Sequence, residues 1–116
     1  MTEKDIRFLE FVVEQTRLDK IRWEITADPT KFVASLRGKF KITIDRSVDE
    51  DDHFQHFLTL LDDADRELLV LWGHDNPKVH RLFDLARRNS LSVDKVLDEI
   101  MGGEEIGEIK DEDIPF

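Results

Sequence analysis

The chain has 116 residues, no cysteine and a formal net charge of −10 at pH 7. Hydrophobic residues make up 40% of it and charged residues 38%, which is enough apolar material for one core of ordinary domain size inside a densely charged surface. The lack of cysteine excludes a disulfide framework, thiolate catalysis and cysteine-ligated zinc, and it fits a reducing cytoplasm. The acidic balance argues against a general nucleic-acid or membrane binder, because such surfaces draw their affinity from Lys and Arg.

The first ten residues, MTEKDIRFLE, lack the basic and then apolar run of a secretory signal. No segment approaches the roughly 18 consecutive apolar residues that a membrane-spanning helix needs. We therefore expect a cytoplasmic protein that has no membrane partner.

The N-terminal part of the sequence predicts a helix followed by a strand. Apolar residues recur at helical spacing over residues 3–18, and Thr2 with Asp5 three residues later forms a capping-box pattern before them. The spacing then changes to two in KIRWEIT, residues 20–26, where Trp23 and its alternate neighbours share one face. This alternation is typical of a half-buried strand.

Two further strands follow the turn ADPT. Residues 31–36 and 39–44 alternate in the same way, and Arg37 and Gly38 between them permit a tight reversal. Three successive strands predict an antiparallel meander. The acidic stretch at residues 45–52 is predicted to be a loop.

The next two segments predict a hairpin. Residues 53–61 and 66–72 are rich in apolar residues and flank the turn DDAD at residues 62–65. Their apolar residues fall on both faces, so we expect these strands to be covered on both sides.

Two helices close the domain. Asn76 and Pro77 are typical of a helix start, Ser92 is a cap for a second helix, and Gly102 and Gly103 end it. Apolar residues recur at helical spacing in both segments, so we expect both helices to cover the sheet. The sequence therefore predicts a single α+β domain over residues 1–101. It consists of an N-terminal helix, a five-stranded mainly antiparallel sheet and two C-terminal helices, and an acidic tail at residues 102–116 follows it.

The histidines and acidic clusters are the first candidates for catalysis or metal binding. His53 and His56 are three residues apart, and on a strand such residues point to opposite faces, so they do not suit one metal ion. DEDDH, residues 49–53, lacks the glycine and the distal Glu of an EF-hand, and DDAD fits a hairpin turn. The sequence has neither a nucleophile elbow nor a Gly-rich phosphate loop. We therefore expect no enzyme, no metal and no cofactor.

Basic residues concentrate between residues 17 and 46, where eight Lys and Arg occur with four Asp and Glu. At strand spacing, several of them share the face opposite the apolar one, which would place cations in a row suited to phosphates. The large aromatic residues fall on the apolar face, however, and not beside the cations where bases would stack. Nucleic-acid binding is therefore an alternative function. Its candidate residues are Arg22, Lys39 and Lys41.

The tail is the most unusual part of the sequence. Residues 102–116 contain six acidic residues and one Lys, a net charge of −5 that equals the charge of all the preceding residues. The tail ends in a rigid Pro115 and in Phe116, whose ring and α-carboxylate occupy one residue. A receptor for this ending needs an apolar pocket for the ring, a cation for the carboxylate and a basic rim for the acids. The predicted partner-binding residues are Asp111, Glu112, Asp113, Ile114, Pro115 and Phe116.

This ending resembles the C-terminal tip of bacterial single-stranded-DNA-binding proteins, an acidic run that closes in Asp-Ile-Pro-Phe or Asp-Leu-Pro-Phe. The resemblance covers residues 111–116. In that family the tip recruits enzymes of replication, recombination and repair, with the terminal Phe as the anchor. The resemblance implies an interaction protein that docks on the same DNA-processing enzymes. The body departs from that family, which carries an N-terminal oligonucleotide-binding barrel and a long Gly/Gln/Pro-rich linker.

Other interpretations of the tail and body stay open. Ile106, Ile109 and Ile114 would let the tail pack on its own sheet or helices, or dock into a neighbouring copy to form a homo-oligomer. The body loosely resembles small bacterial proteins of unknown function with a GKFKITI strand and an LFDLARR…VDKVLDEI helical pair. That resemblance implies no activity.

Overall fold

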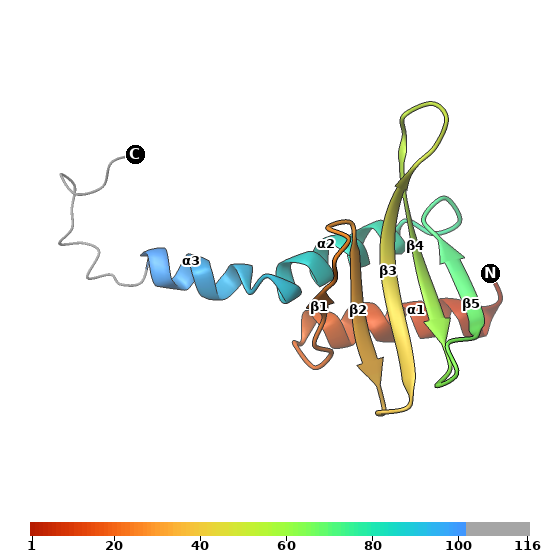
Figure 1. Cartoon of the computed structure of the whole chain (residues 1–116), viewed down its shortest axis with the longest axis horizontal. Coiled ribbons are helices and arrows are strands. Elements are labelled where there is room, and N and C mark those ends of the chain that lie inside the picture. The colour runs from red at the N-terminus through yellow and green to blue at the C-terminus, as the bar shows by residue number, and fades with distance from the viewer. Residues whose placement is uncertain (102–116) are drawn as a thin grey trace.

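The computed structural model of the protein describes residues 1–101. These residues form three helices and a five-stranded sheet, an α+β architecture that confirms the predicted fold class. Figure 1 shows how these elements are arranged. In chain order the elements are α1 (Glu3–Arg17), β1 (Glu24–Ile25), β2 (Lys31–Leu36), β3 (Phe40–Val48), β4 (Phe54–Leu61), β5 (Glu67–Trp72), α2 (Lys78–Ser90) and α3 (Val93–Met101).

The sheet is an antiparallel meander, as predicted. Its strand order is β1-β2-β3-β4-β5, so every strand pairs with its neighbours in the sequence. The register aligns the apolar residues of successive strands: Ile44 on β3 lies opposite Phe32 on β2 and Leu58 on β4. One face of the sheet is therefore continuously apolar.

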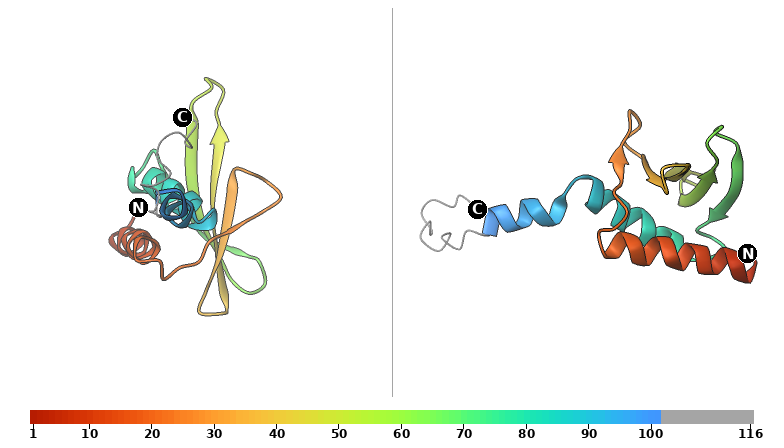
Figure 2. Two further views of the ribbon diagram at one scale, coloured as in Figure 1. Left: turned by 90° about the vertical axis from the view of Figure 1, so that its left-hand side faces the viewer. Right: turned by 90° about the horizontal axis from the view of Figure 1, so that it is seen from below.

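Helices α1 and α2 lie side by side on that apolar face (Figure 2). The prediction that β4 and β5 are covered on both sides is wrong for the part of the chain that the structure describes. Both helices pack on one face, and Val70 and Trp72, on the other face of β5, stay partly exposed. The buried hydrophobic core consists of Leu9, Val12, Ile21, Trp23, Phe32, Ala34, Ile42, Ile44, Leu58, Leu71, Val79, Leu82, Phe83 and Ala86.

Helix α1 begins with the predicted capping box. The Thr2 hydroxyl accepts a hydrogen bond from the Asp5 amide at 3.0 Å, and the Asp5 carboxylate accepts one from the Thr2 amide at 3.0 Å. Two backbone donors that a helix start leaves unpaired are thereby satisfied.

The strand predicted for residues 20–26 is wrong in its length, because only Glu24 and Ile25 pair with β2. Trp23 is bound by the helices instead. Its backbone amide donates to Oδ1 of Asn89 at 2.8 Å, and its indole N–H donates to the Thr16 hydroxyl at 3.0 Å. These two hydrogen bonds of Trp23 thus go to α2 and α1 and not to the sheet.

Replacing Thr16 by valine should lower the free energy of unfolding by about 1–3 kcal/mol, because the buried indole N–H of Trp23 would lose its acceptor. Urea denaturation of the purified protein measures this change. Trp23→Phe provides the control, because this variant has no indole donor. In it, Thr16→Val should lower the free energy of unfolding by clearly less. Equal costs in both backgrounds would show that the hydrogen bond contributes nothing.

The loop predicted for residues 45–52 is also shorter than expected. Strand β3 runs to Val48, which pairs with Phe54, and Arg46 pairs with His56. The Arg46 guanidinium carbon lies 4.7 Å from the centroid of the Phe54 ring, so a cation–π contact accompanies the pairing. Strand pairing therefore outweighs the acidic, loop-like composition. The turn that remains is held by Asp49, whose carboxylate accepts the amides of residues 51 and 53.

The turn DDAD is confirmed between β4 and β5. The Asp62 carboxylate accepts the backbone amides of Ala64 and Arg66 at 2.9 Å each, and its other oxygen accepts from Nε of Arg66 at 2.7 Å. These acids thus build a hairpin turn.

The two C-terminal helices differ in their packing. Helix α2 buries Val79, Leu82, Phe83 and Ala86, as its periodicity predicted. Helix α3 follows Ser92 and was expected to cover the sheet, but none of its residues is buried, and it extends away from the domain (Figure 1). Among residues 1–101, no helix has the length and apolar character needed to cross a membrane.

Candidate functional site

Helix α3 presents an apolar stripe that stays exposed to solvent. The exposed fractions of Val96, Leu97, Ile100 and Met101 are 45%, 39%, 55% and 58%. A nine-residue helix is marginally stable in water by itself, and its amphipathic pattern normally faces a packed surface. A contiguous exposed stripe of this kind is typical of an interaction element.

The predicted tip, residues 111–116, lies outside the described residues. The structure does describe the residue from which the tail continues. This residue, Met101, ends α3 at its outer end, on the side away from the sheet (Figure 1).

The three residues considered for nucleic acid do not form one row. Lys41 lies on the sheet face away from the helices, and its ammonium binds the Asp65 carboxylate at 2.9 Å. Lys39 lies in the turn between β2 and β3, with its Nζ 5.6 Å from the centroid of the Phe40 ring. Arg22 precedes β1, because the strand is shorter than predicted, and it lines a separate cleft of about 490 Å³ at the base of α3.

A groove of about 510 Å³ lies between α1 and the end of the sheet where β2 turns into β3, and we call it the α1 groove. Aromatic and aliphatic side chains dominate its lining, and no acidic side chain is among the described residues that border it. The lining residues are Phe8, Phe11, Gln15, Lys20, Ile21, Ser35, Leu36, Arg37, Phe40 and Leu60.

The α1 groove combines an apolar floor with a basic rim. Phe11 is 48% exposed, which is high for a large aromatic residue on a helix that faces a core. Lys20 and Arg37 are exposed on the rim, and Lys39 belongs to the same turn as Arg37. In a chain of net charge −10, a local concentration of cations without acids suits an acidic ligand that carries an apolar group.

The α1 groove could not be predicted from the sequence, because its lining comes from segments between residues 8 and 60 that only the fold brings together. One signal was present. Phe11 is an apolar residue that falls outside the buried stripe of α1, which contains Leu9, Val12 and Thr16.

A second distinctive arrangement joins β4 to α2. The Nδ1 atoms of His56 and His80 lie 2.6 Å apart, so one ring donates a hydrogen bond and the other accepts it. The His56 ring also packs on Phe83, with 4.4 Å between the centroids. Gly73 makes the approach possible, because a Cβ at that position would overlap the His80 ring. Burial lowers the pKa of His56 to about 4, and the charges of His80 and Arg46 add to the effect.

The His56 pKa predicts how stability depends on pH. The ordinary value of 6.5 applies to the unfolded chain, so the unfolded state binds this proton more readily. The folded state with neutral His56 therefore has its full stability above pH 6.5, and it loses this stability as the pH falls towards 4. We expect a loss of about 1 kcal/mol between pH 7 and pH 5, allowing for screening of this partly exposed ring.

Urea denaturation of the parent protein and of His56→Gln over this pH range measures the contribution. The variant should have the shallower pH dependence, whereas His53→Gln, at an exposed position, should behave like the parent. Parallel curves for parent and His56→Gln would refute the prediction.

One group of described side chains has ligand atoms close enough for a metal ion. Atoms of Asp49, Asp51 and His53 lie within 4.8 Å of one another, and all three residues are exposed. Hydrogen bonds of the Asp49 carboxylate to backbone amides account for this clustering as part of the turn.

Comparison with protein-family models found no match, and neither did comparisons with curated proteins and with solved structures.

Proposed function

We propose that the protein is a non-enzymatic interaction protein whose acidic tip docks on enzymes of DNA replication, recombination or repair. The partner is an enzyme that recognises the tails of single-stranded-DNA-binding proteins. The tip consists of residues 111–116, where acids precede Ile114, Pro115 and Phe116. The partner would supply an apolar pocket for the ring and cations for the acids.

The structural observation that supports this proposal best is the position of α3. Its residues are not buried, and its outer end is the attachment point of residues 102–116. A binding segment attached there starts well away from the sheet, where a large partner meets little steric hindrance. The exposed apolar stripe of α3 offers such a partner additional contact area.

The proposal places the protein in the cytoplasm, where DNA-processing enzymes act. Its net charge of −10 also suits a ligand of basic, DNA-binding enzymes, because opposite charges accelerate association.

A competition assay tests the proposal. A fluorescent tail peptide of a bacterial single-stranded-DNA-binding protein is bound to a purified tail receptor, such as a DNA-processing enzyme known to bind it, and is titrated with the intact protein. Displacement at micromolar protein concentration would support the proposal. Lack of displacement from a panel of such receptors would refute it. A version extended by Gly-Ser-Gly after Phe116 tests whether binding needs a carboxylate at that residue.

A further inference from the structure

We propose that the α1 groove binds the chain's own acidic C-terminal segment, residues 104–116. The ligand would place Ile114 and Phe116 on the aromatic floor and its acids along the basic rim. The groove and the segment are parts of one chain. The groove offers an apolar floor and a basic rim, and the segment offers apolar side chains and acids that complement them.

The floor of the groove suits apolar side chains of this size. Phe8, Phe11 and Phe40 border it, and half of the surface of Phe11 is open to solvent. Covering such a surface with Phe116 removes apolar area from water on both sides, and two aromatic rings in contact add a further attraction. The volume of about 510 Å³ accommodates the ring together with Ile114.

The charges of groove and segment are opposite. Lys20 and Arg37 lie on the rim, and Lys39 follows in the same turn. Residues 104–113 contain six acids and one Lys. Since the described lining contributes no acid, the segment would meet attraction along the whole rim. These contacts are near the surface, so the attraction should weaken as the salt concentration rises.

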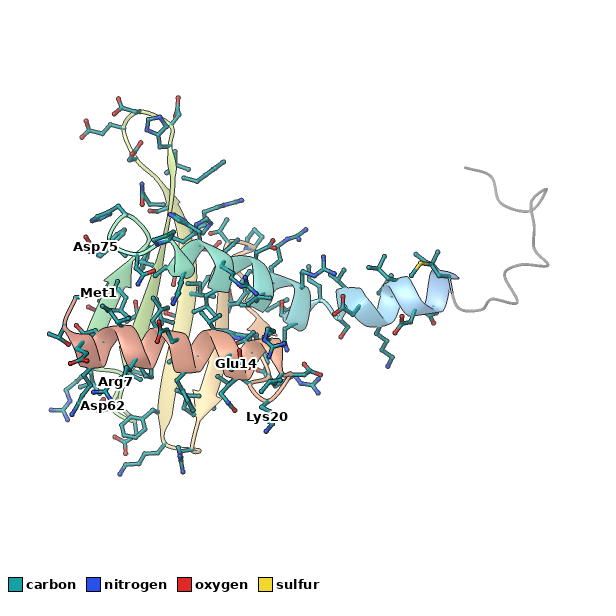
Figure 3. All side chains as sticks on the ribbon, turned by 180° about the vertical axis from the view of Figure 1, so that it is seen from behind. Met1, Arg7, Glu14, Lys20, Asp62 and Asp75 are labelled. Carbon is teal, nitrogen blue, oxygen red and sulfur yellow. The ribbon has the colours of Figure 1, made fainter. Side chains whose placement is uncertain are left out.

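The segment is long enough to reach the groove. The base of α3 lies beside the end of α1, because the Asn89 side chain donates to the Asp19 carboxylate at 2.7 Å. Lys20, the next residue, lines the groove, and Figure 3 shows it at the C-terminal end of α1. Helix α3 carries the chain outward by about 14 Å, whereas the 15 residues beyond it span up to about 50 Å when extended. The extended chain is therefore longer than α3 and can return past its base towards the groove.

Attachment to the same chain favours this occupant over a separate peptide, because short linkers give effective concentrations in the millimolar range. Only tails outside the groove could bind a partner. The apparent affinity of the tip would therefore be its intrinsic affinity multiplied by the fraction of tails that are free. This competition rests on the function proposed above, whereas occupancy of the groove does not.

A spin-label experiment on the full-length chain tests the occupancy. The protein has no cysteine, so Gly107→Cys creates a unique site for a nitroxide. The nitroxide should broaden the amide signals of residues 8–15 and 35–40 in the NMR spectrum of the same chain. Phe116→Ala should restore their intensity, and so should the pair Lys20→Glu and Arg37→Glu.

A pair with the same change in net charge provides the control. Arg87→Glu with Lys95→Glu alters exposed positions on α2 and α3 that lie outside the groove lining, and the broadening should persist. Broadening that persists in the variant with Lys20→Glu and Arg37→Glu would contradict the proposal. A parent protein that shows no broadening would contradict it as well. Broadening of ¹⁵N-labelled chains by nitroxide on separate, unlabelled chains would assign the groove to the tail of a second copy and overturn the intrachain occupant. None of these readouts depends on a tail receptor, so this proposal and the proposed function can fail independently.

Discussion

Replacement of Leu82 by alanine is expected to lower the free energy of unfolding by about 2–5 kcal/mol, whereas Leu97→Ala should change it by less than about 0.5 kcal/mol. The chemical change is identical, but the environments differ. Leu82 on α2 has no exposed surface, and its removal leaves a cavity between the helix and the sheet. Leu97 on α3 is 39% exposed, and no residue of that helix is buried.

Urea denaturation of the two variants at pH 7 measures the difference. A loss of more than about 1.5 kcal/mol for Leu97→Ala would show that α3 packs on its own domain or on a second copy. Repeating the measurement at several protein concentrations separates these cases, because stabilisation by a second copy depends on concentration.

Phe116→Ala is expected to weaken binding to a tail receptor by about 30-fold, which corresponds to about 2 kcal/mol at 1.4 kcal/mol per factor of ten. An aromatic anchor buried in a partner pocket commonly contributes at least this much. Titration of the labelled tail peptide off its receptor measures the loss of affinity.

Single acid replacements in the tip provide the comparison. Asp111→Asn or Glu112→Gln should each weaken binding less than Phe116→Ala does, because exposed ion pairs contribute about 0.2–1 kcal/mol. Their effects should shrink as salt is added, whereas the effect of Phe116→Ala should persist. An acid replacement that costs more than Phe116→Ala would assign the anchoring role to charge and contradict the proposed binding mode.

Local sequence patterns predicted the parts of the fold that depend on neighbouring residues. The capping box at Thr2, the turn at Asp62 and the buried stripe of α2 follow from side chains a few residues apart, so periodicity and turn chemistry suffice to identify them. The order of the strands also followed, because successive strands joined by short turns pair with one another.

The ends of the strands were less predictable. Trp23 alternates with its neighbours as a strand residue would, yet Asn89, 66 positions away, takes its amide hydrogen bond. Residues 45–48 have the composition of a loop, yet pairing with β4 extends β3 through them. In both cases a hydrogen-bonding partner far away in the sequence decides where the strand ends, and periodicity contains no information about that partner.

Sequence alone therefore determined the α+β class, the meander, the helix positions and the tip that motivates the proposed function. Only the tertiary structure decided which apolar residues remain uncovered. Val96 and Ile100 have the same helical spacing as the buried residues of α2, but α3 extends past the sheet and leaves them exposed. The α1 groove and the His56–His80 pair likewise join residues that lie far apart in the chain. Burial depends on the relative positions of whole elements, and local patterns specify only which face of each element is apolar.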